Sequence, residues 1–206
     1  MKIAKLLAER LGRAQADKVV FTVLEKPDRR LPELMEIYLG EFSSMTTLAS
    51  MAFDHLAESV PQLVQSYQPR ILQAALLPAH PSVRRVAIRY FSQQPVVVPT
   101  GFVAPRWAKK ADARYLTRNR LSAVNPHLIE NLEGSVLDTC AAAVADVNEP
   151  TANRAFGIQV CLNLLLKYPE IAGEIAGAIH DTIEHSTPGF KHRGNKALPI
   201  LESLLE

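Results

Sequence analysis

The chain has 206 residues and a mass of 22.7 kDa, a size that suits one domain or two small ones. Apolar residues make up 48% and charged residues 21% of the sequence, which excludes wholesale disorder and collagen-like architectures. Ala and Leu, both strong helix formers, occur 26 times each, whereas aromatic residues account for only 6%. The composition therefore predicts an all-α fold.

Neither the N-terminus nor any internal stretch predicts export or membrane insertion. Charged residues interrupt the first ten positions before the apolar run of a secretory signal can form. No window approaches the roughly 18 consecutive apolar residues that a bilayer-spanning helix needs. Cys140 and Cys161 each lie in an apolar helical pattern without a Cys-x-x-Cys partner, which predicts buried, reduced thiols. We therefore expect a cytoplasmic protein with no membrane partner.

Residues 1–30 are expected to form a helical cap. Ile3, Leu6 and Leu7 follow helical spacing, whereas the run Val-Val-Phe-Thr-Val at residues 19–23 would equally suit a strand. We interpret the whole segment as helical because stacked helical repeats need a terminal element with one polar face.

Residues 31–94 follow with a pattern of paired helices. Helices are expected over 32–40 and 44–57, and then over 61–77 and 82–94. Pro69 is expected to break the third of these helices, because proline interrupts the helical hydrogen-bond ladder. These two pairs form the first two predicted repeats.

Three prolines, Pro150, Pro169 and Pro188, mark expected helix starts in the C-terminal part at intervals of 19 residues. The segment 151–167 is apolar almost all round and predicts an inner helix, whereas the next helix has a single apolar face. Pro199 is expected to kink or divide the last helix. Residues 127–206 therefore contain the third and fourth predicted repeats.

The second helix of each predicted pair begins near residue 44, 82, 151 or 189, so that the first and the last step are both 38 residues. The long middle step is explained if the 32 residues 95–126 are an insertion between the second and third repeats. Hairpins that recur at this period indicate an α-solenoid, in which neighbouring hairpins share one core. We predict a single domain over residues 1–206.

One of these second helices carries a family resemblance. The stretch from His80 to Phe91, His-Pro-Ser-Val-Arg-Arg-Val-Ala-Ile-Arg-Tyr-Phe, resembles the second helix of HEAT repeats, with Val83, Arg84 and Ala87 at the matching positions. The Asp that is usual in the preceding turn is absent. Residues 149–201 resemble short bacterial HEAT-like proteins of unassigned activity. The resemblance implies a short right-handed, armadillo-type α-solenoid of about four hairpins, and a binding role for it.

Positive charge is concentrated in the middle of the chain. Residues 81–120 carry a net charge of +8, whereas residues 1–80 are neutral overall and residues 121–206 carry −6. This block either binds phosphate, with aromatic side chains available to stack on bases, or docks on the acidic C-terminal repeats. The candidate residues for binding a partner or phosphate are Arg84, Arg85, Arg89, Arg106, Trp107, Lys109, Lys110, Arg114, Tyr115 and Arg118.

No catalytic, cofactor or nucleotide motif is found in the sequence. His180 and Glu184 lie four residues apart and suggest a surface pair, and neither they nor the nearby His185 and His192 predict a metal site. We therefore expect a non-enzymatic scaffold without cofactor or metal, which binds a protein or peptide through its concave face. The alternative is a nucleic-acid-binding protein, less plausibly a glycosylase similar to the HEAT-like alkylpurine DNA glycosylases. The oligomeric state is left open.

Overall fold

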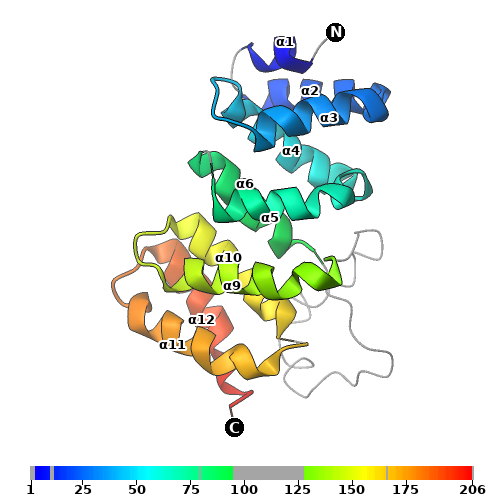
Figure 1. Ribbon diagram of the computed structural model, residues 1–206. Helices are drawn as coiled ribbons and strands as arrows, with labels where there is room; N and C mark the ends of the chain where they lie inside the picture. Colours follow the sequence, from blue (N-terminus) through cyan, green and yellow to red (C-terminus); the bar gives the residue numbers. More distant parts are fainter. Residues whose placement is uncertain (1–2, 10–11, 79, 95–127, 166, 206) are drawn as a thin grey trace. The chain divides into compact units, whose positions relative to one another are not determined.

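The computed structural model describes residues 3–9, 12–78, 80–94, 128–165 and 167–205 (Figure 1). These residues form ten α-helices and three short 3₁₀ helices, and they contain no strand, so the predicted all-α class is confirmed for them. The α-helices are α1 (Ile3–Leu7), α2 (Arg13–Glu25), α3 (Pro27–Leu39), α4 (Thr46–Ser59), α5 (Gln68–Leu76), α6 (Pro81–Ser92), α9 (Glu133–Ala145), α10 (Thr151–Leu164), α11 (Ala172–Ile183) and α12 (Pro188–Glu202).

Helix starts follow the prolines, as the sequence indicates. Pro188 is the first residue of α12, and Pro69 lies in the first turn of α5, where its missing N–H leaves no helical bond unmade. The residues before Pro69 form a 3₁₀ helix, Pro61–Tyr67, so the expected break is confirmed. Pro199 lies inside α12 and does not divide it, so of the two expected effects, a kink or a division, the division does not occur.

The described residues fall into two compact units, Met1–Tyr90 and Phe91–Glu206. In the first unit, α1 packs on α2 and α3, and α2 packs on α4. The helix α3 packs on α4 and also contacts α5. Residues 19–23 lie in α2, which settles the choice between helix and strand, and α1 and α2 form a hairpin of their own beside α3 and α4 (Figure 1).

Three aromatic side chains form the centre of the first unit. Tyr38 and Phe53 stack with their ring centroids 4.4 Å apart, and Phe53 contacts the ring of Tyr90 at 5.7 Å. All three are buried. The Tyr38 hydroxyl donates to the Val83 carbonyl at 3.4 Å, and Gln68 Nε2 donates to the Tyr90 hydroxyl at 3.2 Å. The rings therefore tie α3, α4 and α6 into one core.

Burial raises the pKa of Tyr90 to about 12 and raises that of Tyr38 still more. The stability that their neutral forms contribute is fully present below about pH 10, the pKa of a free tyrosine; the contribution of Tyr90 is lost as the pH rises through about 12, and that of Tyr38 at still higher pH. We expect phenolate absorbance from these two residues to appear only together with loss of helical circular dichroism. Tyr38→Phe and Tyr90→Phe should each remove one tyrosine from the phenolate absorbance that appears well above pH 10. Titration of all tyrosines near pH 10 with intact helices would contradict this expectation.

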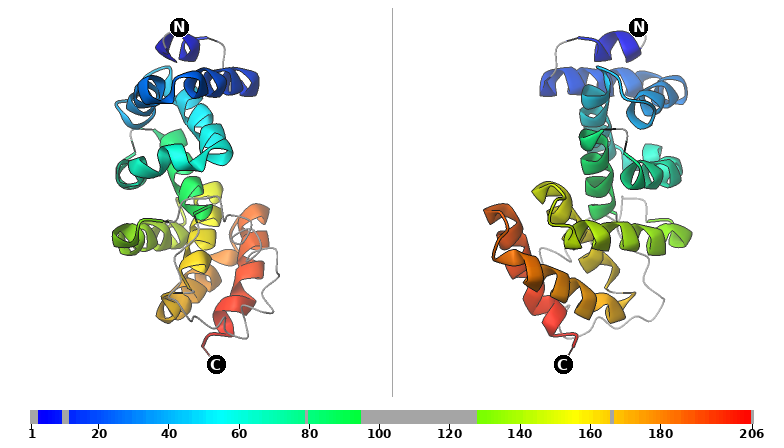
Figure 2. Two further views of the ribbon diagram at one scale, coloured as in Figure 1. Left: turned by 90° about the vertical axis from the view of Figure 1, so that its right-hand side faces the viewer. Right: turned by 60° about the vertical axis from the view of Figure 1, so that its left-hand side comes forward.

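In the second unit two hairpins lie side by side. The helix α9 packs on α10, and α11 packs on α12. Corresponding helices of the two hairpins pack together. The first helices, α9 and α11, contact each other, and so do the second helices, α10 and α12. Both views of Figure 2 show the orange α11 running beside the red α12. The helix α10 buries residues on most of its circumference, which confirms that it is an inner helix.

Gly157 allows α10 to approach α9 closely. A Cβ atom at this position would lie 2.9 Å from the Cys140 carbonyl oxygen and 3.1 Å from a methyl group of Val144. The nearest atom is a backbone oxygen of α9, which cannot move aside as a flexible side chain can. Gly157→Ala should therefore lower the free energy of unfolding by about 1–3 kcal/mol. Gly177→Ala in α11 is the matched control, because open space surrounds that position. Equal stability of the two variants in urea unfolding would contradict the close approach.

None of the described helices has both the length and the apolar character that crossing a membrane requires.

Candidate functional site

Only three of the ten candidate residues lie in the part of the chain that the structure describes. Arg84, Arg85 and Arg89 all belong to α6. The other seven, Arg106, Trp107, Lys109, Lys110, Arg114, Tyr115 and Arg118, lie outside the described residues, as does the whole predicted insertion, residues 95–126.

Two of the three arginines bind groups of the protein itself. Arg84 donates from Nη1 to the Ala75 carbonyl, near the C-terminal end of α5, where cationic groups are favoured. Arg89 forms ion pairs with Asp54 and Glu58 of α4. Both side chains therefore connect α6 to neighbouring helices.

Arg85 is the exposed member of the set. It lies four residues before Arg89, so both side chains start from the same side of α6. The structure thus keeps one of the predicted arginines at the surface, next to an arginine that is held by carboxylates.

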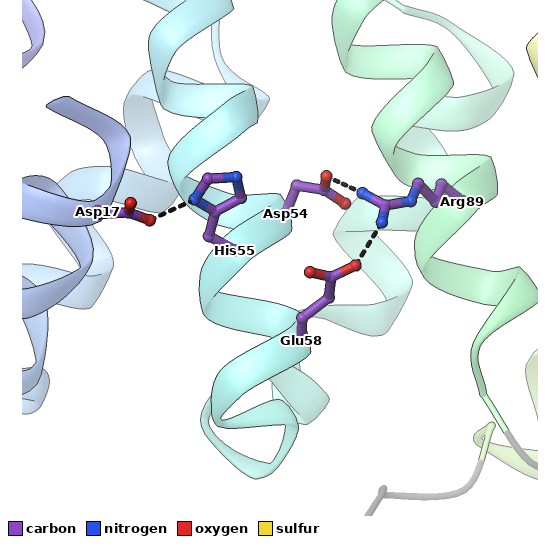
Figure 3. A network of polar contacts seen from close by, with 5 residues as sticks. All are labelled: Asp17, Asp54, His55, Glu58 and Arg89. Atoms are coloured by element: carbon purple, nitrogen blue, oxygen red, sulfur yellow. Dashed lines mark hydrogen bonds and ion pairs between the residues drawn. The ribbon is translucent and has the colours of Figure 1, made fainter. Parts of the chain in front are cut away.

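The ion pairs of Arg89 continue into a row of polar contacts across three helices. His55 Nδ1 lies 2.7 Å from Asp17 Oδ1, which connects α4 to α2. Figure 3 shows Asp17, His55, Asp54, Glu58 and Arg89 following one another from α2 through α4 to α6. The side chains belong to successive second helices of the first unit, so they define one face of it. We call this the α2–α4–α6 face.

An exposed aromatic side chain lies on the same face. Phe21 follows Asp17 by one turn of α2 and is 71% exposed, the largest exposed fraction of an aromatic side chain among the described residues. Met51 lies one turn before His55 in α4 and is half-buried. Sequence analysis missed Phe21, because the run at residues 19–23 was read only as a choice between helix and strand. Its position opposite the buried Val19 and Val23 was the available signal.

The charges of this face are mixed. Asp17, Asp54 and Glu58 are set against Arg85 and Arg89, so carboxylates outnumber guanidinium groups. Burial lowers the pKa of Arg89, but its two carboxylate partners hold the guanidinium in place.

A second polar cluster lies at the start of α9 in the other unit. Glu133 is fully buried, and its Oε2 accepts hydrogen bonds of 2.8 Å from Lys167 Nζ and from the Tyr168 hydroxyl. Lys167 also donates to Glu130 at 2.8 Å. Hydrogen bonds to both carboxylates raise the pKa of Lys167, and the bond to Glu133 raises that of Tyr168. The cluster ties the start of α9 to the segment that follows α10.

Arg154 of α10 forms the third polar arrangement. Its side chain is almost completely buried, with Nε and Nη2 donating to the Val144 carbonyl at 3.1 and 3.0 Å. Nη2 also donates to Thr182 Oγ1 at 2.6 Å, and Nη1 donates to Ser186 Oγ at 3.1 Å. The guanidinium lies 3.9 Å from the ring centroid of Phe190. Burial lowers the pKa of Arg154, and the charge of Asp146 opposes this effect.

The predicted histidine pair has a different partner. His180 Nε2 lies 2.9 Å from Glu202 Oε1 of α12 and is not paired with Glu184, because α12 packs along α11 and brings Glu202 close. Within the described residues, no three His, Cys, Asp or Glu side chains are grouped as metal ligands. Cys140 and Cys161 are buried and are not joined in a disulfide, as expected, and burial raises the pKa of the Cys161 thiol.

Comparison with protein-family models, with curated proteins and with solved structures gave no match to this chain.

Proposed function

We propose that this protein is a non-enzymatic scaffold, a short HEAT-like α-solenoid that recognises a protein or peptide partner through the α2–α4–α6 face. The packing of like helices supports the solenoid part of the proposal. In the second unit α9 contacts α11 and α10 contacts α12, and in the first unit α1 contacts α3 and α2 contacts α4. When hairpins stack in this manner, the second helices of all the hairpins lie side by side, and their exposed sides form one continuous surface.

The observation that carries the proposal is the exposed Phe21 beside the row of polar contacts. Aromatic side chains that protrude into water are favourable centres of protein interfaces, because a partner that covers them gains apolar burial. Paired charges around such a centre supply hydrogen bonds and orientation more than affinity. Phe21 with the pairs Asp17–His55 and Arg89–Asp54 has this composition.

The same face favours a protein partner over a nucleic acid. The three carboxylates of the face exceed its two guanidinium groups by one negative charge, so the face lacks the excess of positive charge that binding to a phosphate backbone requires. Nucleic-acid binding would have to depend on the basic block further along the chain, whose residues lie outside the described part. Nuclease treatment therefore separates the two functions in one experiment.

The test is affinity capture from the native cell with the full chain and two matched variants. Phe21→Ala removes the aromatic side chain of the face, and Leu77→Ala removes an equally exposed apolar side chain, 75% exposed, near the end of α5. We expect Phe21→Ala to reduce recovery of the captured partner about tenfold or more, the effect of losing an interface centre worth about 1.4 kcal/mol or more. Leu77→Ala should leave recovery unchanged.

Both substitutions replace exposed side chains, so thermal unfolding of each variant should match that of the parent chain. The captured protein should also survive nuclease treatment. Equal recovery with Phe21→Ala and Leu77→Ala would overturn the assignment of this face. Loss of all captured material on nuclease treatment, with binding that weakens steeply as salt is raised, would replace the proposal by the nucleic-acid alternative.

A further inference from the structure

We draw no further inference here: the strongest candidate, the exposed carboxylates of Asp138, Glu174 and Asp181 on the packed helices α9 and α11, consists of acidic surface side chains alone, and nothing in the described part of the chain shows what binds to them.

Discussion

Replacing Arg154 by Ala is expected to lower the free energy of unfolding by about 3–4 kcal/mol. The substitution removes the donors to the Val144 carbonyl and to the hydroxyls of Thr182 and Ser186, and it leaves a void beside Phe190. An unpaired buried carbonyl costs about 1–3 kcal/mol, and the cavity adds a further loss. Urea unfolding followed by circular dichroism measures the difference.

Arg154→Lys tests whether charge alone is sufficient at this position. A lysine retains the positive charge but lacks the planar fork that reaches three helices at once, so its loss of stability should be nearly as large. Lys196→Ala, at an exposed basic position of α12, is the control and should change stability by less than about 0.5 kcal/mol. If Arg154→Ala is as stable as Lys196→Ala, the contacts of Arg154 contribute nothing to the fold.

Replacing Lys167 by Met should cost about 3 kcal/mol, because it leaves the fully buried Glu133 carboxylate without its cation. The double variant Glu133→Leu with Lys167→Met should recover much of this loss. Neither charge of the pair remains in it, and replacing a buried ion pair by apolar side chains is often neutral. The unfolding free energies of the parent, both single variants and the double variant together give the coupling energy of the pair.

Lys196→Met serves as the control for the added apolar side chain, since Lys196 is exposed. The sign of the coupling decides the interpretation. If Lys167→Met unfolds at the same urea concentration as the parent chain, or if the double variant is less stable than either single variant, the buried pair does not stabilise the start of α9.

Much of the helical architecture was predictable because helix starts are local events. Proline at a first turn and an apolar stripe on one side are properties of short segments, which is why α5, α10 and α12 lie close to their expected positions. The start of α3 at Pro27, five residues ahead of the expected Pro32, was missed. Pro32 was taken as the first residue, whereas it lies inside α3, where it has no N–H to donate to the carbonyl of Asp28.

The polar contacts were not predictable, because they depend on which helices become neighbours. Arg89 and Asp54 are 35 residues apart, and no pattern in either segment indicates that the two side chains will meet. Nothing in the sequence singled out Arg154, yet the packing of α11 and α12 around it buries the guanidinium. The sequence drew attention to the arginines of α6 because of their charge. Their partners could be identified only from the fold.

The sequence separations of the Arg154 contacts also predict an order in which the second unit is completed as the chain is synthesised. Its acceptor Val144 is 10 residues away, whereas Thr182 is 28 residues away and Ser186 is 32. The guanidinium and the Val144 carbonyl therefore leave the ribosome almost together, and the shorter loop costs less entropy to close. The nascent α9–α10 hairpin keeps the remaining donors of Arg154 in water until α11 emerges to receive them.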